Sequence, residues 1–310
     1  MAGASSFRNE QQGMRFLIGC LVCIAAAALL PHARGEIVVR DDVGATVRLR
    51  APATRIVALA PHIVETLYAA GAGGHLVGAV DYSDHPPAAR RLARVGGYSR
   101  VDLEAVVALR PDLVIAWESG NDMGQVDKLR ALGLAVYVSQ PNALPEIADQ
   151  IERLGELAGT QATARAAAAA FRQRLAALRT THAGKPVVRV FYQIWKAPLT
   201  TVGGPQIISD AIRLCGGDNV FGHLRRMSPT VSVEAVLAAN PEAIVATGMG
   251  DARPDWLHDW DRWTGMTAVR RGNLFHINPD LMQRHTPRIL DGTEKLCAAL
   301  DVARSRRPQP

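Results

Sequence analysis

A sixteen-residue segment occurs twice in this chain, and this repeat limits the possible folds more than any other feature. The first copy, at 102–117, reads DLEAVVALRPDLVIAW, and the second, at 232–247, reads SVEAVLAANPEAIVAT. Each copy predicts a short amphipathic helix that stops before a proline, followed by an apolar run typical of a buried parallel strand. The copies start 130 residues apart, which is too far for stacked short repeats and suits two similar α/β lobes in one chain.

Predicted strands alternate with predicted helices in both halves of the chain, which indicates two mostly parallel sheets. We expect an N-terminal α/β lobe over 36–142, a C-terminal α/β lobe over 183–303 and a short tail over 304–310. Ligands of two-lobed proteins usually sit between the lobes. The chain is therefore expected to carry its ligand in a cleft between two sheets.

The segment at 143–182 has a different pattern, with apolar residues on a 3.6-residue period among alanines and arginines. As one helix it extends more than about 50 Å, which is longer than one small lobe requires. We therefore predict a single long helix that joins the two lobes. The alternative is two ordinary helices with a turn at Gly159.

The composition is that of a globular protein that buries large cores, because 48% of its 310 residues are hydrophobic. The formal net charge is +6, and much of the excess lies near the two ends of the chain. No basic stripe is interleaved with aromatic residues, which argues against nucleic acid as a partner.

The first 35 residues have the features of a signal peptide. An apolar stretch at 16–30 follows a basic residue and precedes a small-residue site compatible with cleavage before Glu36. The stretch is short for a membrane span. A lipoprotein site at Cys20 is the alternative, but the apolar run follows this cysteine instead of preceding it. We expect an exported, periplasmic mature chain.

Removal of residues 1–35 leaves Cys215 and Cys297 as the only cysteines of the mature chain. An oxidising compartment favours a disulfide between them. Two separate buried thiols remain an alternative. A metal pair is a weaker one, because neither cysteine has histidine or cysteine neighbours in the sequence.

Sequence signatures of catalysis are poor. The chain has no phosphate-binding loop, no nucleophile elbow and no paired-histidine zinc helix, and its nine histidines are scattered singly. This pattern favours a binding protein over an enzyme. A secreted α/β enzyme with its active site in the cleft is the alternative from another class.

Aromatic and polar residues follow predicted strands or the first repeat, at the places where open α/β sheets bind ligands. Stacking faces with a few hydrogen-bonding groups suit a large ligand that is partly apolar and partly amide-bearing. Each aromatic residue taken alone is equally typical of a lobe core. The candidate ligand-binding residues are Tyr82, Tyr98, Trp117, Trp195, Asp280 and Arg284.

Nearly the whole mature chain resembles the periplasmic substrate-binding proteins of ABC importers that carry cobalamin. These are relatives of siderophore and haem binders of class III, in which one long α-helix joins two Rossmann-like lobes. The loop DYSDHPP and the strand PDLVIAW point to the cobalamin branch. The resemblance rests on 55–61 with Glu65 and Thr66, and on 80–87, 103–117, 214–221 and 286–288.

The resemblance implies a role for each candidate. Tyr82 and Trp117 would touch the corrin ring or its amide side chains from the first lobe, and Tyr98 would replace a family tryptophan. Asp280 and Arg284 would hydrogen-bond amides from the second lobe. Trp195 would face the same cleft. Cobalamin is thus implied as a transported ligand and not as a catalytic cofactor.

The resemblance also implies partners and a disulfide. Glu104 and Glu234, which occupy equivalent positions of the repeat, would meet arginines on the two subunits of an inner-membrane ABC permease dimer. A second interpretation of the two glutamates requires no partner protein. A carboxylate in the first turn of a helix interacts favourably with the helix dipole. Cys215 and Cys297 would form the family's disulfide. We expect the protein to be a monomer.

Departures from the family pattern affect the ligand more than the fold. Tyr98 stands where the family has tryptophan, and Leu281 and Met282 replace an aromatic pair, so the stacking surface is thinner. The nearest alternative is a haem or ferric-siderophore binder of the same fold, with His62 or Tyr82 as an iron ligand. His62 is also placed to approach a bound cobalt as an axial contact. A histidine at the start of a helix more commonly has no ligand role.

Overall fold

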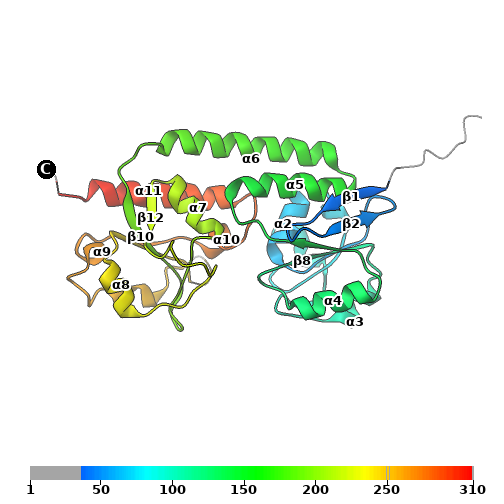
Figure 1. Cartoon of the computed structure of the whole chain (residues 1–310), viewed down its shortest axis with the longest axis horizontal. Coiled ribbons are helices and arrows are strands. Elements are labelled where there is room, and N and C mark those ends of the chain that lie inside the picture. Colours follow the sequence, from blue (N-terminus) through cyan, green and yellow to red (C-terminus); the bar gives the residue numbers. More distant parts are fainter. Residues whose placement is uncertain (1–35, 249, 251, 309–310) are drawn as a thin grey trace, which may run out of the picture. The chain divides into compact units, whose positions relative to one another are not determined.

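A computed structural model describes residues 36–248, 250 and 252–308. The chain divides into two units, 1–36 and 37–310, and the second unit holds two lobes, each built on a sheet flanked by helices (Figure 1). The predicted signal peptide, 1–35, lies outside the described residues. Within them, no helix is both long and apolar enough to cross a membrane.

The N-terminal lobe is built on a five-stranded parallel sheet with the order β5-β4-β3-β8-β9. Its strands are largely buried because helices cover both faces. α2 and α5 (Leu144–Ala158) pack on one face, and α3 and α4 on the other. The bounds are β3 Ile56–Ala58, β4 Leu76–Ala79, β5 Ala93–Arg94, β8 Leu113–Trp117, β9 Val136–Ser139, α2 Pro61–Ala69, α3 Leu103–Ala108 and α4 Met123–Ala131.

Short elements complete this lobe. The first described residues form an antiparallel hairpin, which is a two-stranded sheet of its own that packs near α5. A second short antiparallel pair follows the loop after β5. These elements are β1 Ile37–Arg40, β2 Thr46–Leu49, β6 Gly96–Gly97 and β7 Arg100–Val101, with 3-10 helices η2 Gly73–His75 and η3 Pro87–Arg91.

The C-terminal lobe repeats this plan. Its sheet has the order β11-β10-β13-β14, with β12 also paired to β10, and every pairing except that of β11 is parallel. The predicted α/β class with two mostly parallel sheets is therefore confirmed. The bounds are β10 Val188–Trp195, β11 Thr200–Thr201, β12 Gly217–Asn219, β13 Ala243–Ala246, β14 Leu274–His276, α7 Ile207–Leu214, α8 Val233–Ala239, η4 Asp255–Trp260, α9 Thr267–Arg270, α10 Pro279–Met282 and α11 Ile289–Ser305.

The sequence repeat is also a structural repeat. α3 with β8 and α8 with β13 are equivalent helix–strand units, and their helices are capped alike. The side chains of Asp102 and Ser232 accept a hydrogen bond from the backbone N–H three residues on, at 3.0 and 3.2 Å. Arg110 and Asn240, each just before the proline, both have a left-handed backbone, with φ of 47° and 40°. The duplicated segment thus dictates the same local structure twice.

The helical run at 143–182 is two helices and not one. α5 (Leu144–Ala158) ends at Gly159, whose φ of 72° is left-handed, and α6 (Gln161–His182) begins two residues later. A Cβ at this glycine would also collide with Pro52. The periodicity does not reveal the turn because glycine is tolerated within a helix, whereas here its left-handed backbone ends α5. The alternative with a turn at Gly159 is the correct one.

One helix of this pair still connects the lobes. α6 contacts α2 of the N-terminal lobe and α7 and α11 of the C-terminal lobe, and it lies along the same side of both (Figure 1). Its 22 residues span about 33 Å at the usual rise. A continuous apolar core runs beneath the α5–α6 pair through both lobes. This shared core ties the two sheets together on the side opposite α3 and α8.

Part of the predicted tail at 304–310 belongs to the last helix. α11 continues through Ser305, past the expected boundary. Arg304 Nε donates a hydrogen bond to a backbone carbonyl at 2.7 Å, and Arg307 Nε donates to Glu242 Oε2 at 2.9 Å. Two arginines of the predicted tail therefore form hydrogen bonds with other parts of the C-terminal lobe.

The expected disulfide is present within the C-terminal lobe. Cys215 follows α7, Cys297 lies in α11, and a bond joins their sulfur atoms across 82 residues of sequence. Both residues are buried. The bridge fastens the closing helix of the chain to the sheet region of its own lobe.

Candidate functional site

Five of the six candidate ligand-binding residues line one cavity of about 470 Å³ between the lobes. Tyr82 follows β4 and Trp117 ends β8, so both lie at the carboxyl edge of the parallel sheet, where α/β folds bind ligands. Asp280 lies in α10, which follows β14 of the other lobe. The residues contributed by the two lobes are Tyr82, Tyr98 and Trp117 from the first, and Asp280 and Arg284 from the second.

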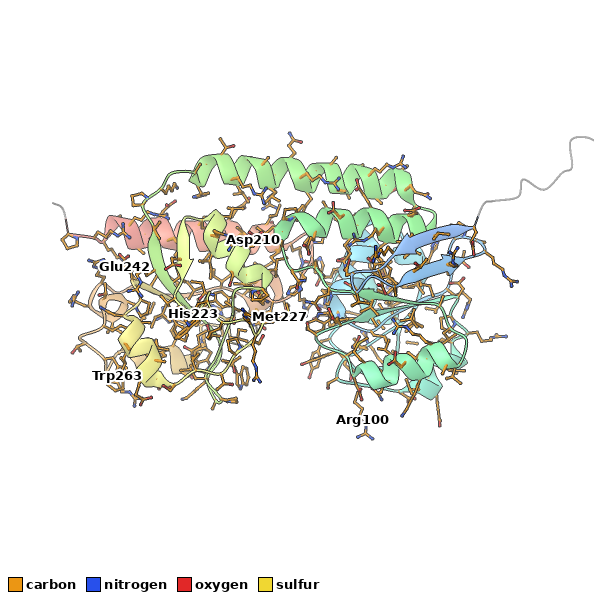
Figure 2. All side chains as sticks on the ribbon, viewed as in Figure 1. Arg100, Asp210, His223, Met227, Glu242 and Trp263 are labelled. Atoms are coloured by element: carbon orange, nitrogen blue, oxygen red, sulfur yellow. A yellow bond between two sulfur atoms is a disulfide. The ribbon has the colours of Figure 1, made fainter. Side chains whose placement is uncertain are left out.

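A second cavity of about 440 Å³ adjoins the first and shares Tyr98, Trp117 and Gln283 with it. Met227 lines this cavity and lies on the side of the C-terminal lobe that faces the N-terminal lobe (Figure 2). Cavities of several hundred Å³ are the size that large organic ligands occupy. We call these two adjoining cavities the cleft.

Two tyrosines of the cleft are exposed to an unusual degree. The Tyr82 side chain is 72% exposed, and its backbone is left-handed with φ of 62°. Tyr98 is 42% exposed. A bulky residue rarely adopts a left-handed backbone, and such strain is concentrated at functional sites. The exposure of Tyr82 excludes a place in the core of its lobe.

A network of ion pairs crosses the cleft around Arg284. Its Nη1 donates to Asp84 Oδ1 at 2.7 Å and to Glu65 Oε1 at 3.0 Å, and its Nη2 pairs with Asp280 Oδ1 at 3.1 Å. Burial raises the pKa of Asp84, but the hydrogen bond and charge of Arg284 hold it below the usual value. The structure thus brings the predicted pair Asp280 and Arg284 together with two carboxylates from the other lobe.

Arg288 also belongs to this network, because its Nε donates to Glu65 Oε2 at 2.8 Å. Sequence reasoning missed three members of the network: Glu65, Asp84 and Arg288. Glu65 and Arg288 belong to segments that carry the family resemblance, but no role was assigned to them. Asp84 lies in the loop after β4, next to Tyr82. Charged residues that lie far apart in the sequence show no local pattern that indicates an ion pair between them. These ion pairs were therefore not predictable from the sequence alone.

Two histidines and a tryptophan form the floor of the cleft. The His62 ring lies 5.1 Å from the Trp117 ring and 5.7 Å from the His285 ring, centroid to centroid. Each of the three has a buried ring nitrogen with no hydrogen-bond partner among the described residues. Burial, with the charges of His285 and Arg284, lowers the pKa of His62 well below its usual value. Burial lowers the pKa of His285 as well, and both shifts favour the neutral form of the imidazole.

The unfolding free energy is expected to fall as the pH drops from about 6.5 to about 4. Burial lowers the pKa of His285 to about 4, whereas in the unfolded chain it is about 6.5. Between these values the unfolded chain binds more protons, so acid favours unfolding, by about 3 kcal/mol for this residue.

Denaturant titrations between pH 6.5 and pH 4 measure this loss of unfolding free energy. His285→Gln should reduce this loss but not remove it, because the pKa of His62 is lowered too; His258→Gln, at an exposed histidine, should leave the loss unchanged. An equal slope in His285→Gln and wild type would contradict the assignment.

The structure does not bring Trp195 to either cavity of the cleft. This residue ends β10 and is 41% exposed. Strand β10 shifts register against β11 between Gln193 and Trp195. Its role in ligand binding stays a prediction without support from the cavities.

Glu104 and Glu234 are exposed in the first turns of α3 and α8. These helices lie on the same side of the molecule, opposite α6 (Figure 1). Hydrogen bonds from its own backbone N–H and from the Ser232 side chain hold the pKa of Glu234 below its usual value. The repeat therefore presents one carboxylate from each lobe on a common face.

The cleft combines aromatic, polar and charged side chains. Among the described residues, no group of three or more histidine, cysteine or acidic side chains is arranged to hold a metal ion. Aromatic faces and hydrogen-bonding groups come from both lobes. This arrangement encloses a ligand from two sides.

Comparisons with known proteins agree with this geometry. Residues 56–281 match a family described as periplasmic binding protein. The chain is 40% identical over 256 residues to a vitamin B12-binding protein of Vibrio cholerae, which covers 82% of this chain and 92% of that protein. It is similar to the crystal structure of a periplasmic vitamin B12 binding protein of Vibrio cholerae, with a TM-score of 0.76, 38% identity and coverage of 82% and 98%. A periplasmic heme binding protein from Pseudomonas aeruginosa gives a TM-score of 0.70, 28% identity and coverage of 83% and 95%.

Proposed function

The chain belongs to the periplasmic binding protein family, and from this premise we propose that it captures cobalamin or a related corrinoid between its two lobes. It acts in the periplasm, catalyses no reaction and delivers its ligand to an inner-membrane ABC permease. The observation that carries the proposal is the cleft, in which aromatic and hydrogen-bonding side chains from both lobes meet. Relatives with at least 34% identity named as vitamin B12-binding proteins favour a corrinoid as the occupant.

The chemistry of a corrinoid matches the cleft. The corrin ring is broad and apolar on its faces and carries amide side chains at its rim, so it needs stacking surfaces and hydrogen-bonding groups together. Tyr82 and Trp117 offer aromatic faces from the N-terminal lobe. Asp280 accepts and Arg284 donates hydrogen bonds from the C-terminal lobe. Tyr98, shared by both cavities, extends the stacking surface.

Replacing Trp117 with alanine is expected to weaken cyanocobalamin binding by at least about tenfold, because a buried aromatic contact is commonly worth more than 1 kcal/mol at an interface. Calorimetric titration measures the loss. Trp117→Phe should lose less, since it keeps an aromatic face. Trp263→Ala is the matched control, because this tryptophan lies in the C-terminal lobe away from the cleft (Figure 2). Equal affinity of Trp117→Ala and Trp263→Ala would contradict the assignment of Trp117.

A haem or ferric-siderophore ligand is the second candidate, and the similarity to a periplasmic heme binding protein favours it. Tyr82, exposed in the cleft, is placed to act as an iron ligand. His62 also lines the cleft, but its Nε2 atom is buried. An iron-dependent absorption spectrum that is lost in Tyr82→Phe or His62→Ala would support this candidate over a corrinoid.

The permease contact is proposed at Glu104 and Glu234. Both carboxylates are exposed, one on each lobe, and their helices lie on one side of the molecule. A two-lobed monomer with equivalent charges matches a partner with two-fold symmetry. Arginines on the two permease subunits would complement these charges.

A further inference from the structure

The carboxylate of Glu65 is the most buried charged group of the ion-pair network that crosses the cleft. The Glu65 side chain is 3% exposed and belongs to α2 of the N-terminal lobe. Its only described charged partners are two arginines of the C-terminal lobe, which lie 219 and 223 residues further along the chain. A single buried side chain therefore joins the two lobes at the edge of the cleft.

The contacts of Glu65 have the geometry of strong ion pairs. Arg288 binds it in a bidentate manner, with Nε donating to Oε2 and Nη2 donating to Oε1, both at 2.8 Å. Arg284 Nη1 donates to the same Oε1 at 3.0 Å. A buried carboxylate is costly to leave unpaired, so these bonds resist any motion that separates α2 from the arginines.

Only one of the two arginines lines the cleft. Arg284 lines the cleft, whereas neither Glu65 nor Arg288 lines either cavity. Glu65 thus acts on the cleft through Arg284 and not by contact with its occupant. The two arginines lie within one short segment that connects α10 to α11, so holding Arg288 also fixes the backbone that carries Arg284.

We infer that Glu65 is a positioning residue, which fixes the segment carrying Arg284 against the N-terminal lobe and so sets both the lobe spacing and the orientation of a ligand-binding arginine. The expected effect of Glu65 on ligand affinity rests on the proposed function. The expected effect of Glu65 on the distance between the lobes does not depend on which ligand the protein binds.

Distances between the lobes in the ligand-free protein test the inference first. Spin labels at Leu132→Cys and Thr264→Cys, two exposed positions on different lobes, report the distance by pulsed electron paramagnetic resonance. The mature chain has no free cysteine to interfere, because Cys215 and Cys297 are joined. In Glu65→Gln the distance distribution is expected to broaden relative to the unsubstituted background.

Glu242→Gln is the matched control. Glu242 is also a partly buried carboxylate between two arginines, with Arg271 Nη1 at 3.1 Å and Arg307 Nε at 2.9 Å, but all three residues belong to the C-terminal lobe. It lies on the side of that lobe remote from the N-terminal lobe (Figure 2). Its replacement is expected to lower stability without broadening the distance distribution.

Affinity supplies the second readout. Glu65→Gln is expected to weaken cyanocobalamin binding by between about tenfold and a hundredfold, because Arg284 loses a charged hydrogen-bond partner. Glu242→Gln should bind as wild type does. If Glu65→Gln does not fold, Arg288→Gln replaces it, since this variant removes the bidentate partner from a more exposed position.

Two results would overturn the inference. One is an unchanged distance distribution in Glu65→Gln, or in Arg288→Gln where that variant is needed. The other is wild-type affinity in that same variant when the wild-type protein binds cyanocobalamin. If the wild-type protein does not bind cyanocobalamin, the proposed function fails, and the distance measurement still decides whether Glu65 sets the lobe spacing.

Discussion

Exchanging both Glu104 and Glu234 for arginine is expected to abolish ligand uptake by cells while leaving the affinity of the purified protein unchanged. Both carboxylates are exposed and lie on helices remote from the cleft lining, so the change reverses two surface charges without touching ligand contacts. In the proposed contact, arginines at these positions would repel the permease arginines that the two carboxylates are proposed to attract. Uptake of labelled cyanocobalamin, in cells that depend on this binding protein, measures the effect.

The control for this experiment reverses two other exposed acids. Glu156 in α5 and Asp218 in β12 lie outside α3 and α8, and their exchange for arginine changes the net charge by the same amount. Uptake is expected to persist in this control. Uptake at the wild-type rate in the Glu104→Arg and Glu234→Arg double variant would show that these carboxylates do not dock the protein.

Removing the disulfide, by replacing both Cys215 and Cys297 with alanine, is expected to lower the unfolding free energy by about 4 kcal/mol. The bond closes a loop of 82 residues, and a longer loop restricts the unfolded chain more strongly. Denaturant unfolding measures the loss, and reduction of the wild-type protein should reproduce it. A loss below about 1 kcal/mol would mean that the bridge contributes little to stability. Peptide mapping without reductant should recover the two cysteines in one linked pair.

The fold was predictable because its strongest sequence patterns lie within short segments and occur once in each lobe. The segments at 102–117 and 232–247 each carry a helix, a left-handed residue before a proline and a buried strand, and the structure shows both units. The disulfide was predictable for a simpler reason. Once the signal peptide is excluded, Cys215 and Cys297 have no other cysteine to pair with.

The connection between the lobes was harder to predict. The apolar periodicity continues across Gly159 because α5 and α6 both turn an apolar face toward the same shared core. Periodicity reports which face is buried and not whether the chain reverses direction. The left-handed backbone of this glycine becomes evident only when its surroundings are known.

The cleft was predicted in part. Residues at strand ends, such as Tyr82 and Trp117, were identifiable because fold class fixes where strand ends meet. The pairing of Glu65 with Arg284 was not, since it joins positions 219 residues apart through the relative placement of two lobes. Trp195 lines neither cavity, so its role in ligand binding stays a prediction.

Calorimetric titration of the mature chain, from Glu36 onward, with cyanocobalamin tests the central claim most directly. Haem and a ferric siderophore serve as comparators. Our account predicts one-to-one binding at submicromolar strength, about −8 kcal/mol or stronger, and weaker or no binding of the comparators. Absence of heat with cyanocobalamin, together with saturable binding of haem or the siderophore, would contradict it and assign the cleft to an iron-bearing ligand.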